Sequence, residues 1–198
     1  KPVILSTGMS NMEEIKKSVK LFQKLKIPIA ILQTTSQYPC SYEDINLKVI
    51  DNYKKIFKIP VGISDHSLGI YTSLGAVARG ASIVEKHITL DKKMSGPDQK
   101  LSADINDFTN LVSKIRIIEK SLGKHRTIPT PSEEKFKKLM RKSIGTSMDI
   151  NKGTIIKRSM LTIIRPETGI SPIMLDKVVG MTIIKNAKKG ILLSWDMF

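Results

Sequence analysis

The chain has 198 residues, of which 40% are hydrophobic and 26% charged, and its formal net charge is +15. This length and composition support a buried hydrophobic core, which excludes an intrinsically disordered protein. No window approaches the roughly 18 to 20 apolar residues of a membrane span, and the single cysteine, Cys40, excludes an internal disulfide and a cysteine-based zinc site. The sequence therefore predicts a cytoplasmic protein with no membrane segment.

The positive charge does not by itself predict a nucleic-acid partner. Many lysines alternate with apolar residues, as in "EEIKKSVKLFQKLK" at residues 13–26, and aromatic residues make up only 5% of the chain. Such alternation is typical of a solvated helix face, whereas single-stranded nucleic-acid sites interleave basic and aromatic side chains. We expect no nucleic-acid binding, while the charge is compatible with an anionic small substrate.

Strand-like and helix-like segments alternate along the first 123 residues. Apolar runs rich in β-branched residues predict strands, and Asn11 followed by Glu14 predicts the start of the first helix. The expected strands are residues 2–8, 27–39, 61–66 and 81–90, and the expected helices are residues 11–25, 49–57, 69–80 and 103–123. Four strand–helix units in succession predict a parallel sheet with helices outside it.

The pattern of residues changes after Gly123. Residues 124–142 contain two prolines and many charges, which predicts a linker with a short helix. Residues 143–198 consist of short apolar runs separated by turn signals, which predicts a small domain that is largely β or irregular. Because this domain is too small to bury much core alone, we expect it to pack on the first domain or on a partner chain.

Polar residues gather at the carboxyl end of each expected strand. A β/α barrel has its active site at that rim, whereas an open sheet concentrates ligands at one crevice. The pattern favours half of a barrel, although composition alone does not separate the two folds. The polar residues are Ser6, Thr7, Thr34, Ser36, Tyr38, Ser64, His66, Glu85 and His87.

The two histidines at successive strand ends are the main candidates for chemistry. Strand side chains alternate, so Ser64 and His66 share one face, as do Glu85 and His87. Two imidazoles with open positions beside them suit a divalent ion, and the alternative is a pair of hydrogen-bonded core histidines. Asp98, in the loop after the fourth strand, is placed to contact a substrate.

The motifs taken together resemble the sialic acid synthase family, which includes the legionaminic and pseudaminic acid synthases. In chain order they are "KPVILSTGM", "QTTSQYP", "YEDINL", "VGISDHSLG", "GASIVEKHITLD" and "GPDQKLS". The segment from "RKSIG" to "RPETGI" is similar to the family's C-terminal antifreeze-like, or SAF, domain.

The resemblance implies an α/β fold in which residues 1–123 form strands 5–8 of a TIM (β/α)8 barrel and residues 143–198 form a small β-rich SAF domain. It implies condensation of phosphoenolpyruvate with N-acetylmannosamine or a related N-acetylated sugar, which gives a nonulosonic acid and phosphate. It also implies a domain-swapped homodimer. Because a barrel takes roughly 250 residues, we expect the chain to be incomplete and inactive alone.

The resemblance also implies roles for single residues. His66 and His87 match the family's ligands for a divalent ion, Mn²⁺ or Mg²⁺. Ser6, Ser36 and Ser64 match phosphoenolpyruvate contacts, Tyr38 and Asp98 match positions that line the sugar site, and Arg165 matches an arginine that reaches the partner's barrel. Among the departures, Gln33 stands where the family often has histidine, and Glu167 replaces a glycine.

Two other interpretations remain open at this point. A non-catalytic carbohydrate-binding or assembly module would not need the paired histidines, and both are present. A metal-dependent aldolase that uses pyruvate directly would not need the SAF-like tail.

Overall fold

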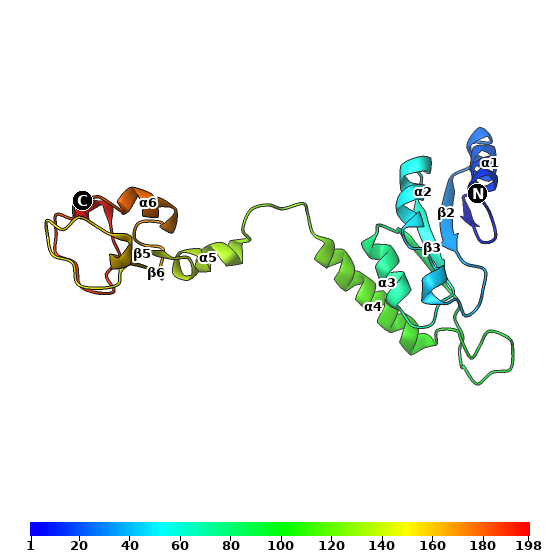
Figure 1. Ribbon diagram of the computed structural model, residues 1–198. Helices are drawn as coiled ribbons and strands as arrows, with labels where there is room; N and C mark the ends of the chain where they lie inside the picture. Colours follow the sequence, from blue (N-terminus) through cyan, green and yellow to red (C-terminus); the bar gives the residue numbers. More distant parts are fainter. The chain divides into compact units, whose positions relative to one another are not determined.

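The computed structural model describes residues 1–198, which form two compact units, Lys1–Lys124 and His125–Phe198. Figure 1 shows the strands and helices of each unit. None of the helices combines the length and the apolar character that a membrane crossing requires.

The first unit is a four-stranded parallel sheet with the strand order β1-β2-β3-β4. Each strand is followed along the chain by a helix, as the sequence predicts, and α3 packs beside α4 (Figure 1). The elements are β1 (Val3–Ser6), α1 (Met12–Lys24), β2 (Ile29–Thr34), the 3₁₀ turn η1 (Tyr42–Asp44), α2 (Val49–Phe57), β3 (Val61–Asp65), α3 (Tyr71–Ala78), β4 (Ile83–Lys86) and α4 (Ile105–Leu122).

Helix α1 begins where its capping residues predict. The Asn11 side chain accepts hydrogen bonds from the backbone N–H groups of Glu13 and Glu14, and the Glu14 carboxylate accepts one from the Asn11 N–H. This reciprocal capping box satisfies N–H groups that lack partners within the helix. The capping prediction is therefore confirmed.

The two faces of the sheet differ in what covers them. On one face, β2 and β3 contribute Ile31 and Ile63 to a core shared with helix residues such as Val19 and Ile50. The opposite face carries the alternate residues, and its free surface includes Ile4, which is 58% exposed. The sheet is thus a curled half-barrel whose helices lie on one side, and the polar strand-end residues fall on the other.

The second unit has its own core around the antiparallel pair β5 (Ser143–Thr146) and β6 (Leu161–Ile164). The expectation that it cannot bury much core was wrong, because Ile144, Ile183 and Leu193 are fully buried within it. Backbone hydrogen bonds between distant loops, such as Ile150 N–H to the Ala187 carbonyl, enclose that core. Its helical elements are α5 (Pro131–Met140), η2 (Arg158–Met160), η3 (Pro172–Met174), α6 (Leu175–Val178) and η4 (Trp195–Met197).

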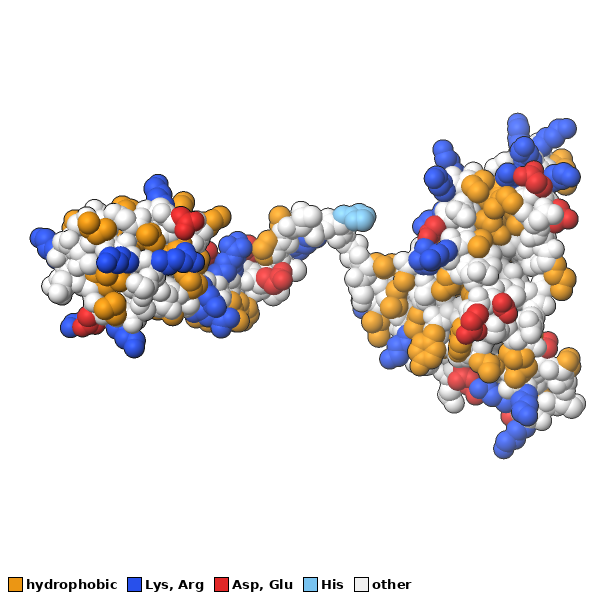
Figure 2. All heavy atoms as spheres, in the orientation of Figure 1, with side chains coloured by type: hydrophobic (Ala, Val, Ile, Leu, Met, Phe, Trp, Pro, Cys, Tyr) orange, Lys and Arg blue, Asp and Glu red, His pale blue; other side chains and the backbone are white.

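Basic side chains are spread over both units on the face that Figure 2 shows. Some are held in exposed ion pairs, such as Lys188 with Asp149 and Lys185 with Asp196. Lys188 lowers the pKa of the Asp149 carboxyl by hydrogen bonding to it. The net charge of the chain is therefore distributed over solvated surface, as the lysine pattern predicts.

Candidate functional site

His66 and His87 lie together at the carboxyl edge of the sheet. Each histidine directly follows a strand, His66 after β3 and His87 after β4, and the parallel register pairs Ser64 with Glu85. Each histidine follows its paired residue by two positions, so the two imidazoles lie at the same level along the strands and on the same face of the sheet. Their ring centroids are 5.1 Å apart, with 75° between the ring planes.

Tyr38 and Asp98 complete a four-residue cluster with the histidines. The Tyr38 ring stacks on His87 at a centroid distance of 4.3 Å and meets His66 edge-on at 5.4 Å. The Asp98 Oδ2 atom lies 3.5 Å from His87 Nδ1. The structure thus joins residues from the ends of three strands and from the loop after β4.

The three candidate serines lie on the same side of the sheet but make different contacts. Ser64 is buried and donates a hydrogen bond to Glu85 Oε1 at 2.7 Å. Ser6 ends β1, and Ser36 lies against Gly8, where an added Cβ would come within 1.9 Å of the Ser36 hydroxyl oxygen. No hydrogen bond links any of these serines to the histidines.

Arg165 belongs to the second unit. Its Nε atom donates a hydrogen bond to the Met140 carbonyl at 2.7 Å, at the end of α5. The two terminal guanidinium nitrogens remain as donors for another group. Arg165 therefore belongs to a different unit from the histidine cluster.

The spacing and donor chemistry of the histidine pair fit a divalent ion. An imidazole nitrogen lies about 2.0–2.1 Å from a zinc-type ion, so two rings that share one ion have centroids within about 6 Å of each other. The observed 5.1 Å satisfies this limit. Asp98 faces Nδ1 of His87, which leaves Nε2 for an ion, and carboxylates commonly orient metal-binding histidines in this way.

The pair would occupy only two positions on such an ion. The chain has no group of three or more His, Cys, Asp or Glu side chains arranged to hold a metal. The other positions would therefore be taken by oxygens from water or substrate, as in sites that keep open coordination positions.

A buried ion pair lies directly behind the site and was not singled out from the sequence. Asp65 and Lys86 precede the two histidines on the opposite face, and their side chains are 0% and 5% exposed with 3.2 Å between charged atoms. Asp65 also accepts hydrogen bonds from the Ser67 N–H and from the hydroxyls of Ser67 and Ser73. The sequence signal for this pair is that Asp65 and Lys86 each stand one position before a candidate histidine, and the strand register then places them side by side.

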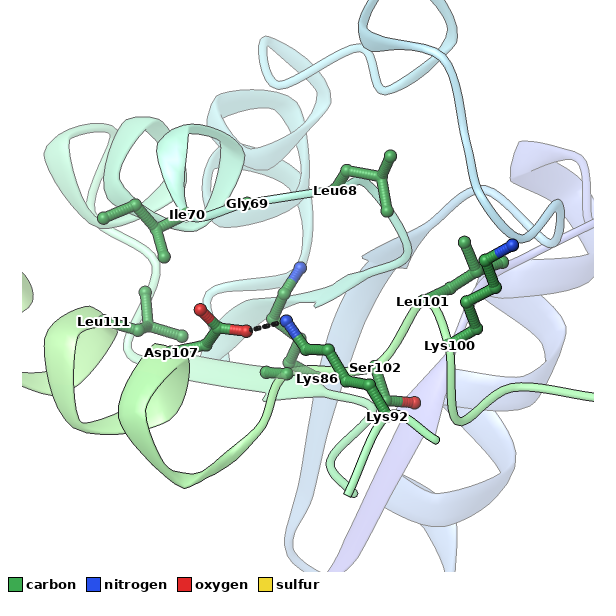
Figure 3. A pocket seen from close by; sticks show the side chains of 11 residues that line it. Leu68, Gly69, Ile70, Lys86, Lys92, Lys100, Leu101, Ser102, Asp107 and Leu111 are labelled. Atoms are coloured by element: carbon green, nitrogen blue, oxygen red, sulfur yellow. Dashed lines mark hydrogen bonds and ion pairs between the residues drawn. The ribbon is translucent and has the colours of Figure 1, made fainter. Parts of the chain in front are cut away.

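A cavity of about 290 Å³ lies beside Lys86 of β4 (Figure 3), and its lining includes no member of the histidine cluster. Lys86, Lys92 and Lys100 line it, but Lys86 pairs with Asp65 and Lys92 pairs with Asp107. The hydrogen bond from Lys92 lowers the pKa of Asp107. Acidic partners thus compensate Lys86 and Lys92, and only Lys100 lines the cavity without an ion pair.

Taken together, a parallel α/β half-barrel with titratable residues at the carboxyl edge has the arrangement in which β/α proteins place active sites. Comparison with known proteins agrees with this class. The NeuB family model matches residues 1–127, and the SAF domain model matches residues 141–198. The chain belongs to the NeuB family.

Similar proteins carry synthase names. The chain is 40% identical to the N,N'-diacetyllegionaminic acid synthase of Campylobacter jejuni, over 98% of the chain and 59% of that protein. It is 36% identical to the human N-acetylneuraminate-9-phosphate synthase, over 93% of the chain and 52% of that protein. The chain therefore spans little more than half the length of these relatives.

A solved structure supports the fold. The crystal structure of the N-acetylneuraminic acid (sialic acid) synthetase of Leptospira borgpetersenii is similar, with a TM-score of 0.64 and 40% identity, over 68% of the chain and 47% of that protein. A putative spore coat polysaccharide biosynthesis protein E from Chromobacterium violaceum, at 19% identity, shares the fold over the whole chain with a TM-score of 0.68.

Proposed function

We propose that this chain supplies the carboxyl-edge part of the active site of a nonulosonic acid synthase, which condenses phosphoenolpyruvate with an N-acetylated amino sugar. The observation that carries the proposal is the pair of imidazoles 5.1 Å apart in a member of the NeuB family. A non-catalytic module would give no reason for two histidines, a tyrosine and a carboxylate to converge at the strand ends. The proposal treats β1 to β4 as strands 5–8 of a barrel.

The reaction needs an electrophilic aldehyde and a site for anionic oxygens. A divalent ion held by His66 and His87 supplies Lewis-acid polarisation of the sugar aldehyde when it is bound. Attack by the phosphoenolpyruvate methylene carbon forms the new carbon–carbon bond, water adds to the resulting cationic carbon, and phosphate then leaves. Tyr38 and Asp98, which flank the imidazoles, would position the sugar.

The serine hydroxyls would bind phosphoenolpyruvate oxygens. Hydroxyl donors aimed at anionic oxygens stabilise charge in a site that excludes water. The Ser64 hydroxyl donates a hydrogen bond to Glu85 in the present structure, so this hydroxyl must turn away from the carboxylate to bind an anion. Ser6 and Ser36, which lie toward β1, would complete this part of the site.

Arg165 would contact the sugar from a partner subunit in a two-fold dimer. Its unit has a separate core and is joined to the first unit by a charged segment with prolines, which suits exchange between subunits. The free end of its guanidinium presents a planar fork of donors to acetamide or carboxylate oxygens.

The proposed activity can be tested in a chimaera in which this chain replaces the matched part of the C. jejuni synthase. We expect phosphate release from phosphoenolpyruvate only when an N-acetylated amino sugar is also present, because phosphoenolpyruvate needs an electrophile to attack. A panel of N-acetylmannosamine and diacetylated sugars would identify the substrate. A folded chimaera that releases no phosphate with any sugar, beside an active parent enzyme, would refute the proposal.

A further inference from the structure

The Lys86 ammonium contacts the residues on both sides of His66. It lies 3.2 Å from the Asp65 Oδ2 atom, and it donates a hydrogen bond to the Ser67 carbonyl at 2.7 Å. Asp65 immediately precedes His66, and Ser67 immediately follows it. Lys86 itself immediately precedes His87. One buried side chain therefore connects the chain around the first histidine to the chain beside the second.

The turn that carries His66 is held by several buried hydrogen bonds. The Asp65 carboxylate, whose side chain is fully buried, accepts hydrogen bonds from the Ser67 N–H at 2.9 Å and the Ser67 hydroxyl at 2.7 Å. It also accepts one from the Ser73 hydroxyl, and the Cys40 N–H donates to the His66 carbonyl at 2.9 Å. Such bonds fix local geometry, because breaking them leaves buried polar groups without partners. They fix the backbone at His66 within the turn, but they do not fix the distance of this turn from β4.

The backbone pairing of β3 with β4 ends before the histidines. The last pair in the register is Asp65 with Lys86, so each histidine lies one residue beyond it. The His87 carbonyl accepts a hydrogen bond from the Ala103 N–H at 3.0 Å, in the segment before α4, whereas the His66 carbonyl is bound in the segment after β2. Different segments therefore hold the two histidine backbones, and the Lys86 side chain joins them across the end of the paired strands.

We propose that Lys86 is a positioning residue that sets the separation of the His66 and His87 imidazoles. Its ammonium holds the turn after β3 against the end of β4, so that the ring centroids lie 5.1 Å apart. The ligands of a functional site must be held within about 0.5 Å of their productive geometry, which requires supporting contacts of this kind. The positioning role concerns the metal-free chain and stands independently, whereas its use in ion binding rests on the proposed function.

The separation of the imidazoles can be measured in the metal-free chain by NMR. Only three histidines are present, so their ring protons are simple to assign, and we expect a nuclear Overhauser cross-peak between the His66 and His87 rings. Asp65→Asn combined with Lys86→Met removes both buried charges, while the new amide oxygen can still accept from the Ser67 N–H. Because the link to β4 is lost and the cross-peak falls steeply with distance, this double variant should weaken the cross-peak several-fold.

Matched variants separate the position of the histidines from the stability of the fold. Ser73→Ala removes a hydroxyl donor to Asp65 but leaves the Lys86 link, so it should lower stability without weakening the cross-peak. Asp51→Asn combined with Arg79→Met makes a matching charge-neutral change in an exposed ion pair, and it should leave the cross-peak unchanged.

A ring contact in the core reports whether each variant is folded. Tyr53 and Phe57 of α2 meet at a centroid distance of 5.9 Å, so their own cross-peak should persist throughout. If Asp65→Asn with Lys86→Met does not fold, Asp65→Leu with Lys86→Met, which fills the same space with apolar groups, decides the outcome.

Mn²⁺ binding gives a second readout. Loss of a contact that orients a metal-binding histidine weakens metal affinity by about 10- to 100-fold, so the Asp65 and Lys86 double variant should bind Mn²⁺ at least about 10-fold more weakly, measured by electron paramagnetic resonance. A cross-peak that weakens in the double variant of a chain that binds no Mn²⁺ would support the Lys86 role and contradict the proposed ion site. A wild type without the cross-peak, an unchanged cross-peak in the folded double variant, or an equal loss in Ser73→Ala would overturn the role.

Discussion

Replacement of Asp65 by alanine is expected to lower the free energy of unfolding of the Lys1–Lys124 unit by about 3–5 kcal/mol. The substitution leaves the Lys86 ammonium buried without its anionic partner, and it also removes the acceptor for Ser67 and Ser73. Urea unfolding followed by far-ultraviolet circular dichroism measures the loss. The only tryptophan, Trp195, lies in the other unit, so its fluorescence transition gives an internal reference that should not move.

Two further variants separate the effect of leaving a buried charge unpaired from the effect of removing a charge. Asp51→Ala breaks an exposed pair with Arg79 and should cost no more than about 1 kcal/mol. Asp65→Leu combined with Lys86→Met removes both buried charges and should be less destabilising than Asp65→Ala, because no unpaired ion remains. Equal losses of unfolding free energy in Asp65→Ala and Asp51→Ala would show that the buried pair contributes no more to stability than the exposed pair.

Replacement of His66 or His87 by alanine in the chimaera is expected to reduce phosphate release by more than about 100-fold. Loss of a residue that only orients a metal ligand costs about 10- to 100-fold, and these substitutions remove the proposed ligands themselves. His125→Ala is the matched control, because His125 is exposed in the second unit and should have no effect. If His66→Ala and His87→Ala both retained activity, the histidine pair would not be the ion site.

The arrangement of the histidines could be predicted because it depends only on strand parity and chain order. Ser64 and His66 alternate with Asp65 along one strand, and Glu85 and His87 alternate with Lys86 along the next. Once the strands are parallel and adjacent, a register that pairs Ser64 with Glu85 brings the imidazoles together. The same parity places Asp65 and Lys86 beside each other on the opposite face.

Other features of the site depend on loop paths and packing that no periodic pattern encodes. Asp98 reaches His87 because of the course of the loop between β4 and α4. The Gln33 amide and the Thr35 hydroxyl donate hydrogen bonds to the Ile45 and Asp44 carbonyls, which lie in the segment between β2 and α2. The core of the second unit arises from bridges between segments far apart in sequence, which length and composition did not indicate.

The divalent-ion dependence of phosphate release by the chimaera tests the central claim most directly. The enzyme is first stripped with excess chelator and then titrated with Mn²⁺ or Mg²⁺ in the presence of phosphoenolpyruvate and the preferred N-acetylated sugar. If His66 and His87 hold the ion that activates the sugar aldehyde, chelation should abolish phosphate release and added ion should restore it. Phosphate release that continues unchanged in excess chelator would contradict the account.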